Sequence, residues 1–204
     1  ISDDWRHFDV LCDGKFYCHM DLGVLGRHNT MNALAVAATS WVMGIPGQKV
    51  TDGVKAFHGA GRRMEYKGEY RGAKVYDDYA HHPDELRATL EAVRGMGDHR
   101  IVLAFQPHTY TRTKLLMDDF IRELQKADVV VLAEIYAARE SNTIGISSAD
   151  LAAQIPGSIY CETLQDVTDC LRSIVREGDI VLTMGAGDIF RAGEALLSGE
   201  DSKK

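Results

Sequence analysis

Residues 100–136 read RIVLAFQPHTYTRTKLLMDDFIRELQKADVVVLAEIY, with two apolar runs on either side of a helical pattern. The apolar runs RIVLAF and DVVVLAEIY predict two strands buried on both faces, and KLLMDDFIRELQKA between them predicts a helix. A strand, a helix and a second strand in this order indicate a parallel pair joined by a right-handed crossover.

The same alternation extends in both directions from this stretch. Toward the amino end, MEYKGEYRGAKVYDDYA predicts two strands joined at Arg71-Gly72, and Pro83 begins a helix with acidic residues in its first turn. Toward the carboxyl end, the predicted elements are the helix SSADLAAQI, the strand SIYC, the helix TLQDVTDCLRSIVREG, the strand DIVLTMG and the helix AGDIFRAGEALL. The pattern predicts an α/β fold, a Rossmann-like, mostly parallel sheet with helices on both faces.

The first part of the chain has a different pattern. HFDVLCD and KFYCHMDL flank an Asp13-Gly14 turn and predict a hairpin. GRHNTMNALAVAATSWVMG then predicts a helix capped by Asn29 and ended by Gly44, and a second helix follows over Val50 to Phe57. The glycine-rich stretch from Gly59 to Arg63 predicts a boundary between a domain of residues 1–59 and one of residues 60–204.

Composition narrows the class of protein. The 204 residues are 45% hydrophobic and 26% charged, which is typical of a folded globular protein. The net charge of −7 and the scattered Lys and Arg residues argue against a nucleic-acid surface. No apolar run predicts a membrane span, no signal peptide pattern is present, and the four cysteines lack Cys-x-x-Cys spacing, so we expect a cytoplasmic protein with reduced thiols.

Polar loops follow four of the predicted strands. DDYAHH, QPHTYTRT, EIYAARE and GAGD each stand where a strand ends. Because ligands of open α/β sheets bind outside the carboxyl ends of the strands, these loops predict a binding site along one edge.

Each polar motif alone leaves alternatives open. Asp77-Asp78-Tyr79-Ala80-His81-His82-Pro83 can bind a metal, contact a ligand, or serve only as a strand end and helix cap. Arg112, in the loop after RIVLAF, suits a carboxylate or phosphate but is equally compatible with a solvated helix start.

Two further motifs are equally ambiguous. Gly185-Ala186-Gly187-Asp188 joins a strand to a helix, where free N–H groups favour an anion, although a plain tight turn explains it as well. Arg62-Arg63 lies at the expected domain boundary, where ligands often bind, or is simply solvated. No G-x-x-x-x-G-K-[ST] phosphate loop occurs in the sequence.

Taken in order, five motifs carry a family resemblance that covers residues from about 23 to 197. GRHNTMNALAVA, FHGAGRRME, VYDDYAHHPDEL, FQPHTYTRT and MGAGDI together resemble the signature of the Mur ligases, and the His-His-Pro and Gln-Pro-His pieces are similar to the member that adds L-alanine. The resemblance implies an ATP-dependent ligase of peptidoglycan synthesis, which joins L-alanine to UDP-N-acetylmuramate through an acyl phosphate.

The resemblance also implies how the chain relates to the whole enzyme. Residues 1–59 would be the end of a central ATPase domain, and residues 60–204 the whole carboxy-terminal domain. The phosphate loop, the residues that bind Mg²⁺ with ATP, and the UDP site would lie upstream of Ile1. The chain alone would then be inactive. The two domains would close on each other for the reaction, and we expect the hinge near Gly59 to Gly61, where a plain linker is the alternative.

By resemblance, the ligand contacts divide into two groups. Asn32 would contact adenine, Arg63 the nucleotide phosphates and Asp78 the ribose, with Asp77 beside it. The residues expected around L-alanine are Tyr79, His81, His108 and Arg112. No catalytic residue or metal ligand is assigned within the chain. Thr109 stands where some family members carry a second Arg, which leaves one cation fewer for the carboxylate.

Two other functions remain as alternatives. A metal-dependent phosphoesterase would use Asp77, Asp78, His81 and His82, and would bind a divalent ion tightly. A non-catalytic nucleotide-binding module would bind ATP without any upstream segment.

Overall fold

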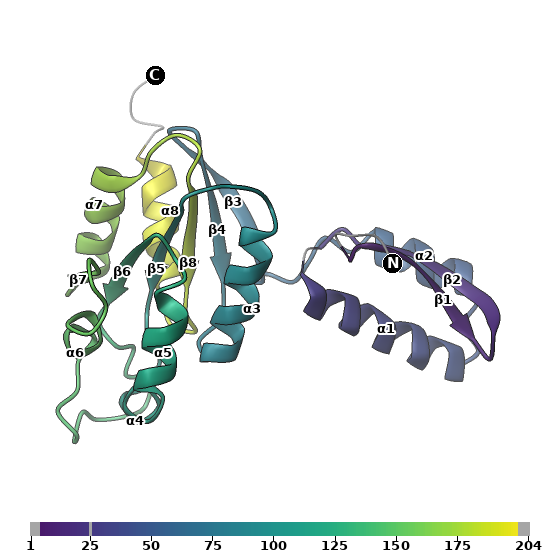
Figure 1. Cartoon of the computed structure of the whole chain (residues 1–204), viewed down its shortest axis with the longest axis horizontal. Coiled ribbons are helices and arrows are strands. Elements are labelled where there is room, and N and C mark those ends of the chain that lie inside the picture. The colour runs from purple at the N-terminus through teal and green to yellow at the C-terminus, as the bar shows by residue number, and fades with distance from the viewer. Residues whose placement is uncertain (1–4, 25, 200–204) are drawn as a thin grey trace. The chain divides into compact units, whose positions relative to one another are not determined.

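The computed structural model describes residues 5–24 and 26–199. The chain divides between Ala60 and Gly61 into two compact units, with residues 91–95 grouped with the first. The first unit holds β1, β2, α1 and α2, and the second holds the remaining elements (Figure 1). Among the described residues, no helix has the length and apolar character needed to cross a membrane.

The hairpin predicted at the start of the first unit is confirmed. Strands β1 (His7–Cys12) and β2 (Lys15–Asp21) pair antiparallel around a turn in which Asp13 and Gly14 have φ values of 51° and 74°. Two positive φ values suit the right-handed twist of the flanking strands. The hairpin packs its buried side chains, among them Phe8 and Met20, against α1 (Arg27–Val42) and α2 (Gly47–Lys55).

The predicted cap of α1 is wrong. Gly26 is the N-cap residue and makes no side-chain cap bond, whereas Asn29 lies inside the first turn with its N–H donating to the Gly26 carbonyl at 2.9 Å. The carboxyl end is as expected, because Gly44 follows the helix with φ 71°. Helix α2 begins at Gly47 and not at Val50, since Pro46 is already an extended residue that can precede a first turn.

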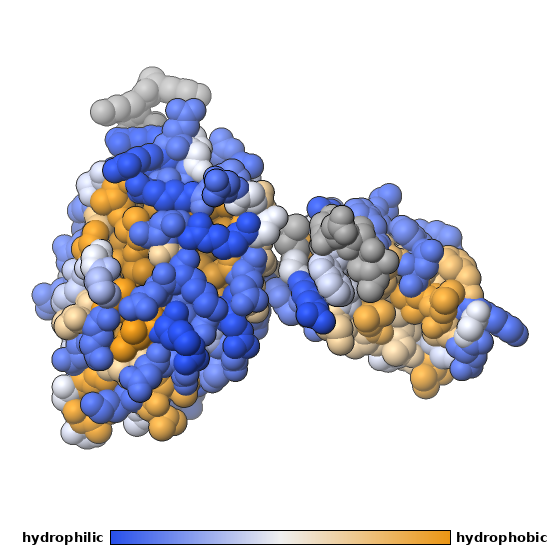
Figure 2. Space-filling view, viewed as in Figure 1, coloured by the Kyte–Doolittle hydropathy of each residue, from blue (hydrophilic) through white to orange (hydrophobic). Residues whose placement is uncertain are grey.

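Helix α1 is apolar on more than one side. Ala33 and Ala37 are buried against the hairpin, while Trp41 and Val42 are 44% and 84% exposed. Figure 2 shows apolar surface on this unit beside its polar regions. A helix that is apolar all round is typical of an element enclosed between layers of a larger domain.

The second unit contains a six-stranded sheet in the order β3-β4-β8-β5-β6-β7. Only β3 (Glu65–Tyr70) and β4 (Ala73–Asp78) are antiparallel. The parallel strands are β8 (Ile180–Met184), β5 (Ile101–Phe105), β6 (Val129–Ala133) and β7 (Ile159–Cys161). The mostly parallel α/β fold predicted from the sequence is confirmed.

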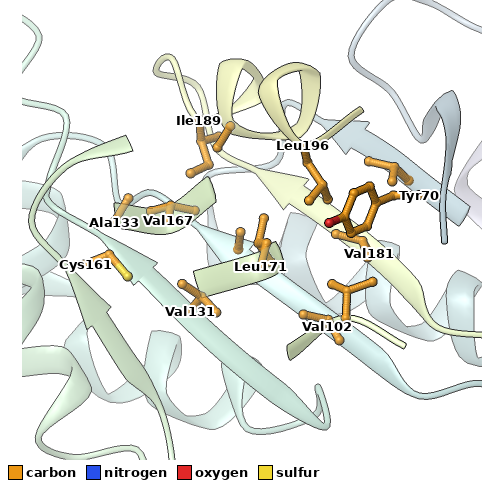
Figure 3. Packing of buried hydrophobic residues seen from close by; sticks show 14 of the residues in the cluster. Tyr70, Val102, Val131, Ala133, Cys161, Val167, Leu171, Val181, Ile189 and Leu196 are labelled. Atoms are coloured by element: carbon orange, nitrogen blue, oxygen red, sulfur yellow. The ribbon is translucent and has the colours of Figure 1, made fainter. Parts of the chain in front are cut away.

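Helices cover both faces of this sheet (Figure 1). On one face lie α7 (Leu164–Ile174) and α8 (Phe190–Ser198), whose Leu171 and Leu196 pack against strand valines such as Val181 (Figure 3). On the other face lie α3 (Pro83–Arg94) and α5 (Met117–Leu124). The ring of Phe120 from α5 lies 5.5 Å from that of Phe105 in β5.

Two predicted helices differ in the structure. The single helix expected over residues 114–127 is divided into α4 (Tyr110–Leu115) and α5, because Leu116 leaves helical geometry with φ −107° and ψ 22°. Helix α6 (Ser148–Ala152) is shorter than predicted. Pro156 disfavours a helical conformation at the residue before it, which limits extension at the carboxyl end.

We expect Leu171→Ala to lower the free energy of unfolding of the chain by about 2–5 kcal/mol, because the side chain is fully buried and its loss leaves a cavity. Urea unfolding followed by circular dichroism measures this change. Leu115→Ala is the matched control in the same unit, since Leu115 is 82% exposed and should change stability by less than about 0.5 kcal/mol. Equal effects of the two substitutions would show that this core is assigned wrongly.

Candidate functional site

The carboxyl ends of four parallel strands meet at one edge of the sheet. Asp78, at the end of β4, pairs with Met184 of β8, and Met184 pairs with Phe105 of β5. Phe105 in turn pairs with Leu132 of β6. The polar loops that follow these strands are therefore neighbours, as expected for an open α/β sheet.

Asp77 is a structural carboxylate at this edge. It is 1% exposed and accepts hydrogen bonds from the Thr183 hydroxyl at 2.8 Å and from Nε of Arg62 at 2.8 Å. A buried carboxylate needs such partners, because removing a charge from water is costly unless it is paired.

Asp78 is also occupied by contacts within the protein. Its Oδ1 accepts the Ala80 N–H at 2.8 Å, and its Oδ2 accepts the Met64 N–H at 3.0 Å and the Thr89 hydroxyl at 3.3 Å. Burial raises the pKa of this carboxyl, while the two backbone N–H groups and the charge of Arg63 oppose the rise. A ribose hydroxyl would therefore have to share oxygens that already hold the neighbouring loops.

Aromatic and imidazole rings form a row across three of the loops. The ring of Tyr79 lies 5.4 Å from that of His81, which lies 5.6 Å from His108. The ring of His108 is stacked on that of Tyr136, the third residue after β6, with 5.7 Å between the ring centres and an angle of 20° between the planes. The structure thus brings together Tyr79, His81 and His108, three of the residues expected around L-alanine, and adds Tyr136.

His108 and Arg112 carry polar atoms that lack partners. His108 Nδ1 and Arg112 Nη1 are shielded from water and make no hydrogen bond among the described residues. Burial, together with the charges of His81 and Arg112, lowers the pKa of His108, and Glu140 opposes this shift. The site therefore combines a neutral imidazole with a guanidinium that has one unpaired nitrogen.

Thr109 holds this loop in an unusual conformation. Its φ is 68°, in the left-handed region that β-branched residues rarely adopt. Its N–H donates to the Tyr136 carbonyl at 2.9 Å, and its carbonyl accepts the Thr113 hydroxyl at 2.7 Å. Such strain persists only where surrounding contacts fix the backbone, and it is frequent at functional sites.

Several N–H groups in and after the turn from Gly185 to Asp188 are already occupied by hydrogen bonds within the protein. The N–H groups of Asp188 and Ile189 donate to Gln106 Oε1 at 2.9 and 3.2 Å, and Gln106 Nε2 donates to Asp188 Oδ1 at 3.0 Å. A Cβ on Gly187 would lie 2.3 Å from the same Gln106 oxygen. These contacts favour the tight-turn interpretation and show that Gln106 holds the turn, a role that the sequence pattern did not predict.

Asn32 and Arg63 are exposed and belong to different units. Asn32 lies on α1, where its Nδ2 donates to Asn29 Oδ1 at 3.4 Å. The side chain of Arg63 is 55% exposed, and its Nη1 lies 3.9 Å from Glu85 Oε1. Their predicted nucleotide contacts stay predictions.

The described residues provide no ligand set for a metal ion. No group of three or more His, Cys, Asp or Glu side chains in residues 5–24 and 26–199 is arranged to hold one. Asp77 pairs with Arg62, and Asp78 is taken by backbone N–H groups. The geometry therefore does not favour a metal-dependent phosphoesterase built on these side chains.

The family model described as the Mur ligase, glutamate ligase domain matches residues 62–187, more than half of the chain. The chain belongs to the Mur ligase family.

Individual relatives agree with this assignment. The UDP-N-acetylmuramate–L-alanine ligase of Lachnospira eligens is 44% identical over 93% of this chain and 42% of its own length. The enzyme of the same name from Caldanaerobacter subterraneus is 43% identical over 97% of this chain and 43% of its own length. The solved UDP-N-acetylmuramate-alanine ligase of Thermotoga maritima has a TM-score of 0.78 at 29% identity, covering 94% of this chain and 42% of that one. The chain spans less than half the length of these relatives.

In this Mur ligase domain, Glu134 fixes the loop at the end of β6. Its Oε2 accepts the Tyr160 hydroxyl at 2.6 Å and the Ser147 hydroxyl at 3.0 Å, and its Oε1 accepts the N–H groups of Ile135 and Ser148. Burial raises the pKa of Glu134, but these hydrogen bonds outweigh it and the pKa is lowered overall. Glu134 therefore joins the end of β6 to the start of α6.

The Tyr160–Glu134 bond predicts a pH-dependent stability. Burial, and next the hydrogen bond to Glu134, raise the pKa of Tyr160 to about 12. The pKa of Tyr160 in the folded state exceeds the unfolded value of about 10. The contribution of the Tyr160 hydroxyl to the free energy of unfolding is therefore complete below about pH 10 and is lost as the pH rises toward 12. We expect the stability difference between the parent and Tyr160→Phe to narrow between about pH 8 and about pH 11 in urea unfolding. A constant difference would show that the phenol is not bonded to Glu134.

Proposed function

We propose that this chain is the carboxy-terminal part of a UDP-N-acetylmuramate:L-alanine ligase, with residues 1–59 completing a central ATPase domain and residues 60–204 forming the alanine-binding domain. Relatives of that name, 44% and 43% identical, support the proposal. The apolar outer side of α1 also supports it, because this helix has the character of an element enclosed in a larger domain.

The buried, unpaired nitrogens Arg112 Nη1 and His108 Nδ1 support the assignment of substrate. An α-amino acid presents a carboxylate and an amine separated by one carbon. Arg112 would hold the carboxylate through a charge-assisted hydrogen bond, and the amine would lie toward His108 and His81. Because Arg112 Nη1 is closed off from water, L-alanine would reach it only after neighbouring side chains shift.

The proposed reaction explains why two substrates must meet beside this edge. The muramate carboxylate is a poor electrophile, so phosphorylation by ATP converts it to an acyl phosphate. The alanine amine then attacks the acyl carbon to form a tetrahedral intermediate, and phosphate leaves as the amide bond forms. Attack requires the unprotonated amine of L-alanine. Because the pKa of His108 is lowered, its ring does not compete with Arg112 for the alanine carboxylate as a cationic ring would.

The nucleotide would be shared between this chain and residues outside it. Asn32 would contact adenine, Arg63 the phosphates and Asp78 the ribose. No phosphate-loop pattern occurs in the sequence. We therefore assign the remaining contacts to the ATP phosphates, the Mg²⁺ that accompanies them and UDP-N-acetylmuramate to the rest of the protein. A stand-alone nucleotide-binding module would need phosphate donors of its own, and this argues against that alternative.

We expect Arg112→Ala in the full-length protein to raise the KM for L-alanine about ten- to a hundredfold, because a hydrogen bond to the substrate carboxylate is lost. The KM for ATP should stay near the parent value. Steady-state formation of phosphate with each substrate varied in turn measures both constants. Lys114→Ala is the matched control, since Lys114 is an exposed cation on the same helix. An unchanged KM for L-alanine in Arg112→Ala would remove Arg112 from the alanine site.

A further inference from the structure

Arg62 crosslinks two strand ends of the sheet. Its Nε donates to Asp77 Oδ2 at 2.8 Å, at the end of β4. Its Nη1 donates to the Gly187 carbonyl at 3.1 Å and its Nη2 to the Gly185 carbonyl at 2.6 Å, in the turn after β8. The Arg62 guanidinium therefore fixes the end of β4 to the turn after β8, and it does so by donating hydrogen bonds to protein oxygens.

The backbone around Arg62 is strained and held at several points. Arg62 and Met64 have φ values of 58° and 47°, in the left-handed region that residues other than glycine rarely adopt. The Arg62 N–H donates to Glu65 Oε2 at 2.7 Å, and the Arg62 carbonyl accepts the Tyr79 N–H at 2.7 Å. Loss of the side-chain contacts would let this segment relax toward commoner conformations.

Two residues proposed to contact different ligands depend on this segment. The guanidinium of Arg62 lies 5.0 Å from the ring of Tyr79 and 4.7 Å from that of Phe190. Arg63, the next residue, lies 5.9 Å from the same Tyr79 ring and projects an exposed side chain. Arg63 belongs to the proposed nucleotide site and Tyr79 to the proposed alanine site.

We infer that Arg62 is a positioning residue that holds the nucleotide contact Arg63 and the alanine contact Tyr79 in one fixed arrangement without binding either ligand. This inference rests on the proposed function. The two neighbouring arginines would then have different roles. The guanidinium of Arg62 donates to protein oxygens, whereas the side chain of Arg63 is exposed at the surface. Movement of the segment from 61 to 64 would then disturb both substrates together.

The experiment compares Arg62→Lys with Arg63→Ala in the full-length protein. Lysine keeps the charge beside Asp77 but cannot reproduce three directed hydrogen bonds from one planar group. We expect Arg62→Lys to raise the KM for ATP and the KM for L-alanine each by about tenfold or more. Arg63→Ala should raise only the KM for ATP. A merely structural role would lower the unfolding temperature and the yield of active enzyme while both KM values stayed at the parent level.

Phe190→Leu supplies a second variant if Arg62→Lys fails to fold. It removes one of the two rings near the guanidinium and leaves the hydrogen bonds, so both KM values should rise together but by less. The inference would be overturned if the folded variant, Arg62→Lys or Phe190→Leu, kept both KM values at the parent level. It would also be overturned if that variant raised the KM for only one of ATP and L-alanine. The proposed function is tested separately by the parent protein, since phosphate formation that does not depend on L-alanine would refute it whatever the Arg62 variants do.

Discussion

The parallel pairing of β4, β8, β5 and β6 is the constraint on which the site depends. Because these strands run in the same direction, four loops that are far apart in the sequence end at one edge of the sheet. Strands β5 and β8 are fully buried, and the buried polar side chains of the four strands, Asp77, Asp78 and Thr183, lie near the carboxyl ends. The chemistry of the domain is therefore confined to the loops, and the sheet sets the distances between them.

Polar groups at this edge divide into those that build it and those that remain available. Asp77, Gln106 and Glu134 have their oxygens occupied by hydrogen bonds within the domain, and they fix the ends of β4, β5 and β6. Burial of these groups is tolerated because each is paired. His108, Arg112, Tyr79 and Arg63 keep unpaired or exposed atoms, and all four are among the residues proposed to contact ligands. Asp78 is the exception, because it is proposed to contact the ribose although its oxygens already hold neighbouring loops.

Local patterns in the sequence were sufficient to predict the alternating strands and helices. A strand buried on both faces gives a short continuous apolar run, whereas the helices between the strands place apolar residues at helical spacing. The ends of the elements were harder to predict. The break at Leu116 has no local signal such as proline or glycine. Helix α1 has Gly26 as its N-cap residue and lacks the side-chain cap expected from Asn29. Four residues expected around L-alanine were named from a family resemblance, and three of them form one row of rings. Contacts such as Gln106 with Asp188 join residues 82 positions apart, so no local pattern could identify them.

We propose that L-alanine binds between the loops that follow β4 and β5, at Tyr79, His81, His108 and Arg112, while the nucleotide lies toward Arg63 and Asp78. A crystal structure of the full-length protein with ADP and L-alanine bound tests it most directly. We expect the alanine carboxylate within hydrogen-bonding distance of Arg112, its amine toward His108, and the ribose and phosphates on the side of Arg63. L-alanine bound away from this edge, with Arg112 and His108 making no contact to it, would contradict the account.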